Sequence, residues 1–199
     1  MNSPTLANET LTLLKLRAVT VTLEQGNILD AEVDAIVCPA NNFLDMNGGL
    51  SASIRRRVGP WVERDAVRNG IIDLGGAVVT EVPSQLPRGP DVRPVKFRYV
   101  IHAPTVPRPM DSATQTSVKL AARVALECAT ILGIQSLAIP AMGTGTGVLS
   151  FNISADCILQ ELARAIRLGM GQLRRVVIVA FEPEFFEAVR QEQFLLSIS

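Results

Sequence analysis

Two glycine-rich segments carry the clearest chemical signal in this sequence. Residues 47–51 read Asn-Gly-Gly-Leu-Ser, and residues 141–147 place a glycine at every second position from Gly143 to Gly147. Glycine permits positive φ angles and a close approach of backbone N–H groups, so loops of this kind form concave sites for anions. Neither segment contains a lysine or an arginine. We therefore expect an anion held by backbone N–H groups, and two such loops side by side suit a diphosphate.

The second segment differs from two common nucleotide-binding motifs. A P-loop ends in Gly-Lys-Ser/Thr, and residues 141–147 contain no lysine. A dinucleotide fingerprint needs a third glycine where this chain has Val148. A turn without a ligand is the plain alternative for this segment alone. The glycine pair at residues 48 and 49, which also leads into an expected helix, favours phosphate.

Strands and helices alternate along the chain and must position these loops. Short β-branched runs predict buried strands at 34–38, 97–103, 136–141 and 175–181, a shorter strand at 77–82, and one or two edge strands within 11–24. Helical periodicity predicts helices at 49–58, 60–69, 117–132, 153–168 with Ser154 as N-cap, and 184–193 as the last. Proline-dense surface loops are expected at 83–94 and 104–109. This order indicates a three-layer α-β-α sandwich with a mixed, mostly parallel central sheet, whose ligand site lies at the carboxyl ends of the strands.

Composition limits the classes of function. The 199 residues contain 19 basic and 19 acidic side chains, so no net charge draws the chain to nucleic acid or to an anionic membrane. Three scattered cysteines and one histidine argue against a metal site, and no cofactor is expected. The cysteine usage fits the cytoplasm. Residues 1–10 lack the charged-then-apolar order of a signal peptide, and no apolar run approaches the roughly 20 residues that span a bilayer. The oligomeric state has no signal in the sequence.

Several segments, in this order and spacing, resemble the macrodomain family. They are residues 26–28, 33–37, 39–42, 48–50, 100–103 and 139–145, and the resemblance runs from about Leu16 to Phe186. It implies a polar tail at 1–10 and a single macrodomain at 11–199. It also implies that the partner is ADP-ribose or an ADP-ribosylated protein.

The resemblance implies a role for individual residues. Asn27 takes the position that accepts from the adenine amino group, Asn41 takes that of the asparagine at the distal ribose, and Phe181 that of the aromatic on adenine. Asn41 could instead only close a turn, and Phe181 could be an ordinary core aromatic. The residues expected to contact the ligand are Asn27, Ile28, Ala40, Asn41, Asn47, Gly48, Gly49, Leu50, Ser51, Met142, Gly143, Thr144, Gly145, Thr146, Gly147 and Phe181.

The same resemblance argues for binding over hydrolysis. One hydrolytic branch of the family has an aspartate where this chain has Ser51, which cannot act as a base near neutral pH. The consecutive glutamates of the poly-ADP-ribose glycohydrolases are missing, and Gly147 replaces a frequent aromatic. Asn41 and Asp45 are the candidate catalytic residues, with a ligand phosphate helping to orient water. The alternative function is therefore an ADP-ribosyl hydrolase or O-acetyl-ADP-ribose deacetylase.

Other conspicuous residues receive structural interpretations. His102 lies in a buried strand, Asp34 is expected to tie down a turn, and Trp61 to pack its helix on the sheet. Another phosphorylated ligand, such as a nucleotide or an RNA end, is a third hypothesis. One tyrosine, one tryptophan and a balanced charge argue against an RNA surface.

Overall fold

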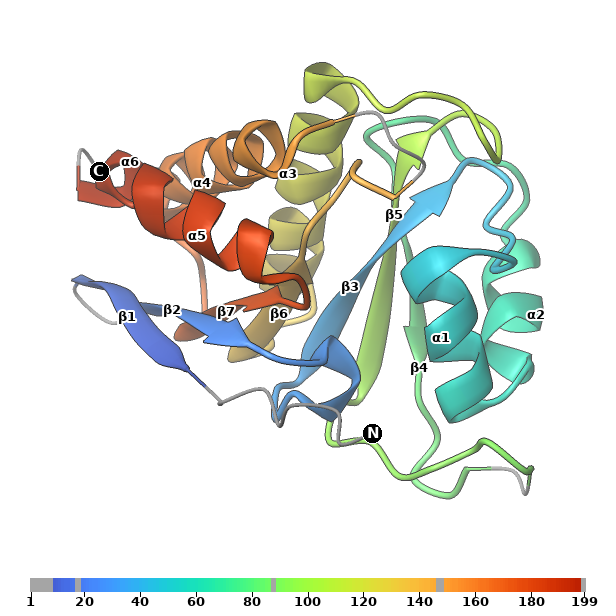
Figure 1. Ribbon diagram of the computed structural model, residues 1–199. Coiled ribbons are helices and arrows are strands. Elements are labelled where there is room, and N and C mark those ends of the chain that lie inside the picture. The colour runs from blue at the N-terminus through green and yellow to red at the C-terminus, as the bar shows by residue number, and fades with distance from the viewer. Residues whose placement is uncertain (1–8, 17–18, 87–88, 146–148, 198–199) are drawn as a thin grey trace, which may run out of the picture.

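A mixed seven-stranded sheet lies between two layers of helices in a computed structural model that describes residues 9–16, 19–86, 89–145 and 149–197 (Figure 1). The strand order across the sheet is β1-β2-β7-β6-β3-β5-β4. The strands are β1 Thr10–Leu16, β2 Val19–Gln25, β3 Ala35–Asn41, β4 Val78–Glu81, β5 Tyr99–Val106, β6 Ser136–Pro140 and β7 Arg175–Ala180. Strands β2, β7, β6, β3 and β5 run parallel, while β1 and β4 are antiparallel edges. The expected three-layer, mostly parallel architecture is confirmed.

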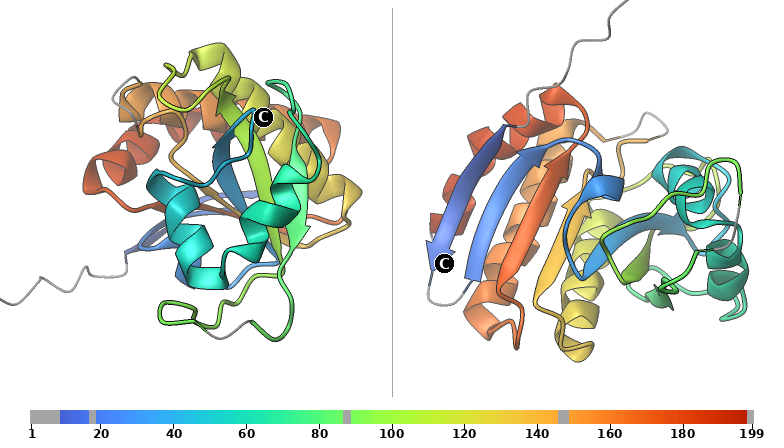
Figure 2. Two further views of the ribbon diagram at one scale, coloured as in Figure 1. Left: turned by 90° about the vertical axis from the view of Figure 1, so that its right-hand side faces the viewer. Right: turned by 90° about the horizontal axis from the view of Figure 1, so that it is seen from below.

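Helices cover both faces of the sheet because the central strands are apolar on both sides. The helices are α1 Gly49–Val58, α2 Trp61–Val67, α3 Gln115–Ile131, α4 Phe151–Leu168, α5 Pro183–Glu192 and α6 Phe194–Ser197. Figure 2 shows α1 and α2 on one face and α3 to α6 on the other. The larger apolar core lies under α3, α4 and α5, and a second core lies under α1 and α2, where half-buried Trp61 packs as expected.

The structure corrects several expected boundaries. Helix α4 begins at Phe151 with Ser150 as its N-cap, so Ser154 is an interior residue and not the cap. Strand β5 continues to Val106, through half of the expected 104–109 loop. Pro104 is tolerated there because β4 pairs with β5 only as far as His102, which leaves the N-side of Pro104 without a ladder partner on that edge. Helix α6 and the 3-10 turn Ile28–Asp30 were not predicted.

The chain termini add two observations. Strand β1 begins at Thr10, whereas most of the expected polar tail falls on residues 1–8, outside the described part of the chain. Within the described ranges, no helix combines the length and the apolar composition that crossing a bilayer requires.

Candidate functional site at the divergence of two central strands

Two central strands separate at their carboxyl ends. The pairing of β3 with β6 reaches only Ile36 and Ala138, whereas the pairing of β3 with β5 continues to Asn41. The chain also turns in opposite directions here, since β6 leads through α4 to β7 and β3 leads towards β5. In open α/β sheets a crevice at such a topological switch point is the usual place for a ligand. Residues 42–48 (loop 1) follow β3 and residues 141–150 (loop 2) follow β6, so both glycine-rich loops begin where these two strands separate. We call the sheet edge between the two loops the candidate crevice.

Loop 1 starts with a turn closed by Asn41. The Oδ1 atom of Asn41 accepts a hydrogen bond from the Phe43 N–H at 2.9 Å, and the Leu44 N–H donates to the Asn41 carbonyl at 3.0 Å. Leu44 is fully buried in a left-handed conformation, with φ 60°. The turn-closing role of Asn41 is thus present. Its Nδ2 makes one long hydrogen bond, 3.5 Å to the Asp45 carbonyl, so this amide is the freer end of the side chain.

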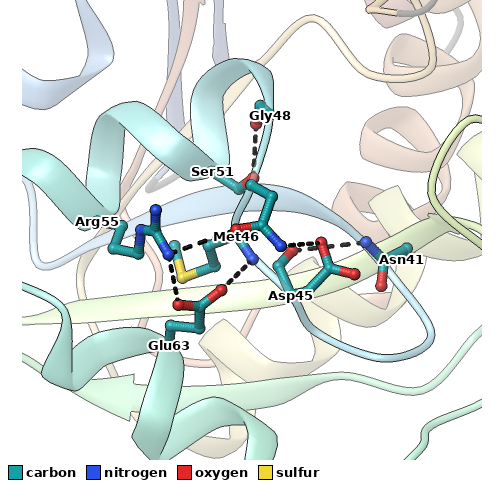
Figure 3. A network of polar contacts seen from close by, with 8 residues as sticks. Asn41, Asp45, Met46, Gly48, Ser51, Arg55 and Glu63 are labelled. Atoms are coloured by element: carbon teal, nitrogen blue, oxygen red, sulfur yellow. Dashed lines mark hydrogen bonds and ion pairs between the residues drawn. The ribbon is translucent and has the colours of Figure 1, made fainter.

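A polar network from the helices holds the middle of loop 1 (Figure 3). The Met46 N–H donates to Glu63 Oε1 at 2.7 Å, and Arg55 Nη1 donates to Glu63 Oε2 at 2.7 Å. The same Arg55 nitrogen lies 3.4 Å from Asn47 Oδ1. Loop 1, α1 and α2 are therefore tied together by one carboxylate.

Loop 1 ends at an open helix N-terminus. Gly48 is the N-cap of α1 and offers no side-chain cap. The first N–H groups of a helix have no acceptor within it, so those of Gly49, Leu50 and Ser51 are free to bind an anion. Gly49 has φ 54°, which favours glycine there. The Ser51 hydroxyl donates to the Gly48 carbonyl at 2.7 Å and is thus engaged in the loop.

Loop 2 is held by packing and by one buried hydroxyl. The Met142 N–H donates to Ser154 Oγ at 3.0 Å, and both residues are fully buried. That N–H is therefore taken out of the set available to a ligand. Gly143 has φ 76°, and a Cβ placed there would lie 2.6 Å from Val118 Cγ2 and 3.0 Å from Leu149 Cδ1. Only glycine fits this position without a shift of its neighbours.

After Gly143, loop 2 becomes accessible to solvent at Gly145. Thr144 is half-buried, and Gly145 is exposed, with open space around the position of a Cβ among the described residues. Thr146 and Gly147, which the sequence also assigns to the ligand, lie outside the described residues.

The far end of the crevice edge carries Asn27 and Phe181. The Gly26 N–H donates to the Ala180 carbonyl at 2.9 Å, which places the residues after β2 and β7 side by side. Exposed Asn27 caps the short turn that contains buried Ile28, its Oδ1 accepting from the Leu29 N–H at 3.0 Å. Phe181 is 60% exposed, so its interpretation as a core aromatic is wrong.

The remaining candidates have structural partners. The pKa of His102 is lowered to about 4 by burial, and its Nε2 lies 3.0 Å from Thr80 Oγ1, so the ring is a neutral core group. Its Nδ1 has no hydrogen-bond partner among the described residues. Asp34 ties down the start of β6, accepting from the Gln135 and Ser136 N–H groups at 2.8 Å each. Asp45 accepts one long hydrogen bond, 3.5 Å from Asn47 Nδ2.

A metal site finds no support in the part of the chain that the structure covers. No group of three or more histidine, cysteine or acidic side chains is arranged there to hold a metal ion. The three cysteines are free thiols.

A large cavity lies away from the loops. It measures about 920 Å³ and is lined by Val33, Asp34 and several described residues between Glu81 and Arg98, at the amino ends of β3 and β5. Two of its basic side chains are engaged in exposed ion pairs, Arg98 with Glu81 at 2.8 Å and Lys96 with Glu32. Exposed, paired charges on a loop make a weak ligand site, and the crevice between the glycine-rich loops is the better candidate.

Sequence reasoning missed three residues that shape the site. Glu63, Arg55 and Ser154 each act through a backbone or side-chain partner that only the fold brings close. Glu63 and Met46 are 17 residues apart, a spacing that carries no recognisable signal.

A family model and several known proteins match most of this chain. The model of the Macro domain family matches residues 37–158. A protein of Aquifex aeolicus is 34% identical over 164 residues, which are 82% of this chain and 92% of that protein. A protein of Aeropyrum pernix is 31% identical over 162 residues, or 81% of this chain and 78% of that protein.

Solved structures agree on the fold. The Oceanobacillus iheyensis macrodomain with ADP has a TM-score of 0.79 at 18% identity, covering 97% of this chain and all, 100%, of that one. The Trypanosoma brucei macrodomain in complex with ADP-ribose has a TM-score of 0.75 at 20% identity, covering 90% of this chain and 72% of that one. At these identities the likeness is one of fold.

Proposed function

The chain belongs to the macrodomain family, and we propose that it binds ADP-ribose or an ADP-ribosyl derivative in the crevice between β3 and β6. The observation that carries this proposal is the pair of loops at the strand divergence. The N-terminus of α1, which follows loop 1, presents the free N–H groups of Gly49, Leu50 and Ser51, and loop 2 follows the neighbouring strand β6 with Gly145 exposed. Two sets of backbone donors without nearby lysine suit two linked phosphates.

The strand order indicates the direction in which we propose that ADP-ribose lies along the sheet edge. Asn27 and Phe181 follow β2 and β7, loop 2 follows β6, and loop 1 follows β3. Neighbouring strands are about 4.8 Å apart, so these features extend over about 14 Å along the sheet edge. We propose that the parts of the ligand follow the same order. Adenine lies at Phe181, the diphosphate lies between the loops, and the distal ribose lies at Asn41. The other contacts that we propose are with Ala40, Asn47 and Thr144. Met142 supports loop 2 from the core.

Binding is better supported than turnover. The Ser51 hydroxyl donates to the Gly48 carbonyl and supplies no base. Asp45 is the carboxylate of loop 1 and has a single long hydrogen bond, which is the observation that favours an ADP-ribosyl or O-acetyl-ADP-ribose hydrolase as the second candidate. If the protein is such a hydrolase, we expect the variants Asn41→Ala and Asp45→Asn to fold but to release no product from an ADP-ribosyl ester or O-acetyl-ADP-ribose. Equal turnover in both variants would exclude this route.

The partners that we propose follow from the site. Free ADP-ribose and an ADP-ribosylated protein share the group that fits the crevice. The free thiols of all three cysteines are compatible with a reducing compartment such as the cytoplasm, which we include in the proposal.

Calorimetric titration with ADP-ribose tests the proposal. Gly145→Glu places a carboxylate in open space at the crevice, so it leaves the fold intact and should abolish binding by steric and charge repulsion. Gln172→Glu is the matched control, because it adds the same charge at an exposed position before β7, at the opposite edge. Wild-type protein without binding at millimolar ADP-ribose, or equal binding by Gly145→Glu, would overturn the proposal.

A further inference from the structure

We propose that Glu63 and Arg55 are a positioning pair that holds loop 1 in the shape that receives a phosphate. This inference rests on the proposed function and adds two residues outside the glycine-rich segments. Neither residue needs to touch the ligand. They act through Met46 and Asn47, the two residues that precede the Gly48 cap of α1 (Figure 3).

Both oxygens of Glu63 are committed to this task. Oε1 accepts from the Met46 N–H and Oε2 accepts from Arg55 Nη1, each at 2.7 Å. Met46 is 1% exposed, so water is a poor substitute for Glu63 as the acceptor of that N–H. The path of the chain from Leu44 to Gly48 is therefore set by a carboxylate on α2.

Arg55 extends the control to the last residues of the loop. It projects from α1, and its Nη1 reaches both Glu63 and the Asn47 side chain, at 2.7 and 3.4 Å. The side chains of Arg55 and Glu63 are 36% and 19% exposed, so the pair is shielded more than an ordinary surface pair. Loop 1 cannot move against α1 or α2 without breaking one of these contacts.

The charge of Glu63 is stabilised in place. Burial works to raise the pKa of Glu63, but the hydrogen bond from the Met46 N–H, and the hydrogen bond and charge of Arg55, outweigh burial and hold this pKa below its ordinary value. The carboxylate is therefore ionised at neutral pH, the form that accepts from both donors.

The protein contains a comparable ion pair on two other helices. Arg123 of α3 donates to both oxygens of Glu161 of α4, at 2.9 Å each, and the Glu161 side chain is 6% exposed. This pair joins two helices, and none of its hydrogen bonds reaches a described residue of loop 1 or loop 2. Removing its charge should affect the stability of the fold without changing the site.

The experiment compares affinities for two ligands in four proteins. ADP-ribose and AMP are titrated calorimetrically into wild type, Glu63→Ala, Glu63→Gln and Glu161→Gln, and thermal unfolding is recorded for each. In the ligand orientation that we propose, AMP reaches Phe181 and loop 2 but not loop 1. AMP therefore reports on the part of the site that Glu63 does not hold.

We expect Glu63→Ala to weaken ADP-ribose binding roughly tenfold, as the loss of a charge-assisted hydrogen bond does, with AMP binding changed less than about twofold. Glu63→Gln keeps an acceptor oxygen for the Met46 N–H and should recover part of the loss. Glu161→Gln should lower the unfolding temperature and leave both affinities at the wild-type level.

Two results would overturn the inference. One is wild-type affinity for ADP-ribose in both Glu63 variants, and the other is an equal loss for ADP-ribose and AMP, which indicates a general structural defect. If Glu63→Ala does not fold, Glu63→Gln carries the test, since it preserves volume and one acceptor. Failure of the proposed function is seen separately, as absent ADP-ribose binding by wild type.

Discussion

Loop 1 and loop 2 border the same crevice, yet different forces hold them. Loop 1 is fixed by hydrogen bonds to a charged pair, Glu63 and Arg55, on the two helices beside it. Loop 2 is fixed by contact of Gly143 with apolar side chains of α3 and loop 2 itself, and by one buried hydroxyl, that of Ser154. The shape of loop 1 therefore depends on charge, whereas that of loop 2 depends on volume. Substitutions that change only one of these properties should separate the two loops.

Of the substitutions that we predict, Gly143→Ala in loop 2 should reduce stability the most. Gly143→Ala puts a methyl group 2.6 Å from Val118 Cγ2 at a φ of 76°. Overpacking and left-handed strain together should lower the free energy of unfolding by about 2–4 kcal/mol. Urea denaturation measures this loss. Gly145→Ala, with open space around the added Cβ, is the control and should stay within about 0.5 kcal/mol of wild type.

A second substitution sharpens that test. Val118→Ala removes the nearest atom that the new methyl group would meet, so Gly143→Ala/Val118→Ala should lose less stability than the sum of the two single changes. If the losses of unfolding free energy in the two single variants simply add in the double variant, packing against Val118 does not hold loop 2.

The buried hydroxyl of Ser154 in α4, which holds loop 2, should have the next largest effect on stability. Ser154→Ala leaves the Met142 N–H buried without its acceptor, which costs about 1–3 kcal/mol of unfolding free energy. Ser53→Ala in α1 is the matched control, because its hydroxyl is more accessible and hydrogen-bonds the Gly49 carbonyl at 3.3 Å. Similar stability of the two variants would contradict the role given to Ser154.

Phe181 provides a reference outside both loops. Since it is 60% exposed, Phe181→Ala should leave the unfolding midpoint nearly unchanged. Loss of stacking, worth about 1 kcal/mol, should weaken the binding of both ADP-ribose and AMP roughly fivefold. Calorimetric titration of the two ligands measures this. A loss confined to ADP-ribose would place adenine elsewhere.

The smallest effect that we expect is a pH dependence of stability, which Glu63 confers on loop 1 and Ser154 does not confer on loop 2. The pKa of Glu63 is lower in the folded protein than its ordinary value of 4.5. Its contribution to stability is therefore complete above about pH 4.5 and is lost as the pH falls through the lower folded pKa. The stability difference between wild type and Glu63→Gln should shrink over that acidic range, as followed by urea denaturation. The difference between wild type and Ser154→Ala should not change with pH for this reason.

The sequence predicts the parts of the site that depend on local geometry. The glycines at 48, 49, 143 and 145 were recognisable because strand-to-helix loops need their conformational freedom. The α1 boundaries agree with the prediction, 49–58, since glycine stands at both ends.

Other parts depend on contacts between distant segments and could not be predicted. Ser154 reads as a helix cap, but Ser150 takes that role, and the hydroxyl of Ser154 turns inward to Met142. Glu63 gives no signal in the sequence because its partner is a backbone N–H with no side-chain signature. The end of β5 was misjudged because the tolerance for Pro104 depends on where the neighbouring strand stops.

We propose that backbone N–H groups on both sides of the crevice bind the diphosphate. Amide chemical shifts of ¹⁵N-labelled protein, recorded during titration with ADP-ribose and separately with adenosine, test it most directly. We predict that the amides of Gly49, Leu50, Ser51 and Gly145 shift with ADP-ribose and stay in place with adenosine. Shifts confined to residues 81–98 around the large cavity, with these four amides unmoved, would contradict it.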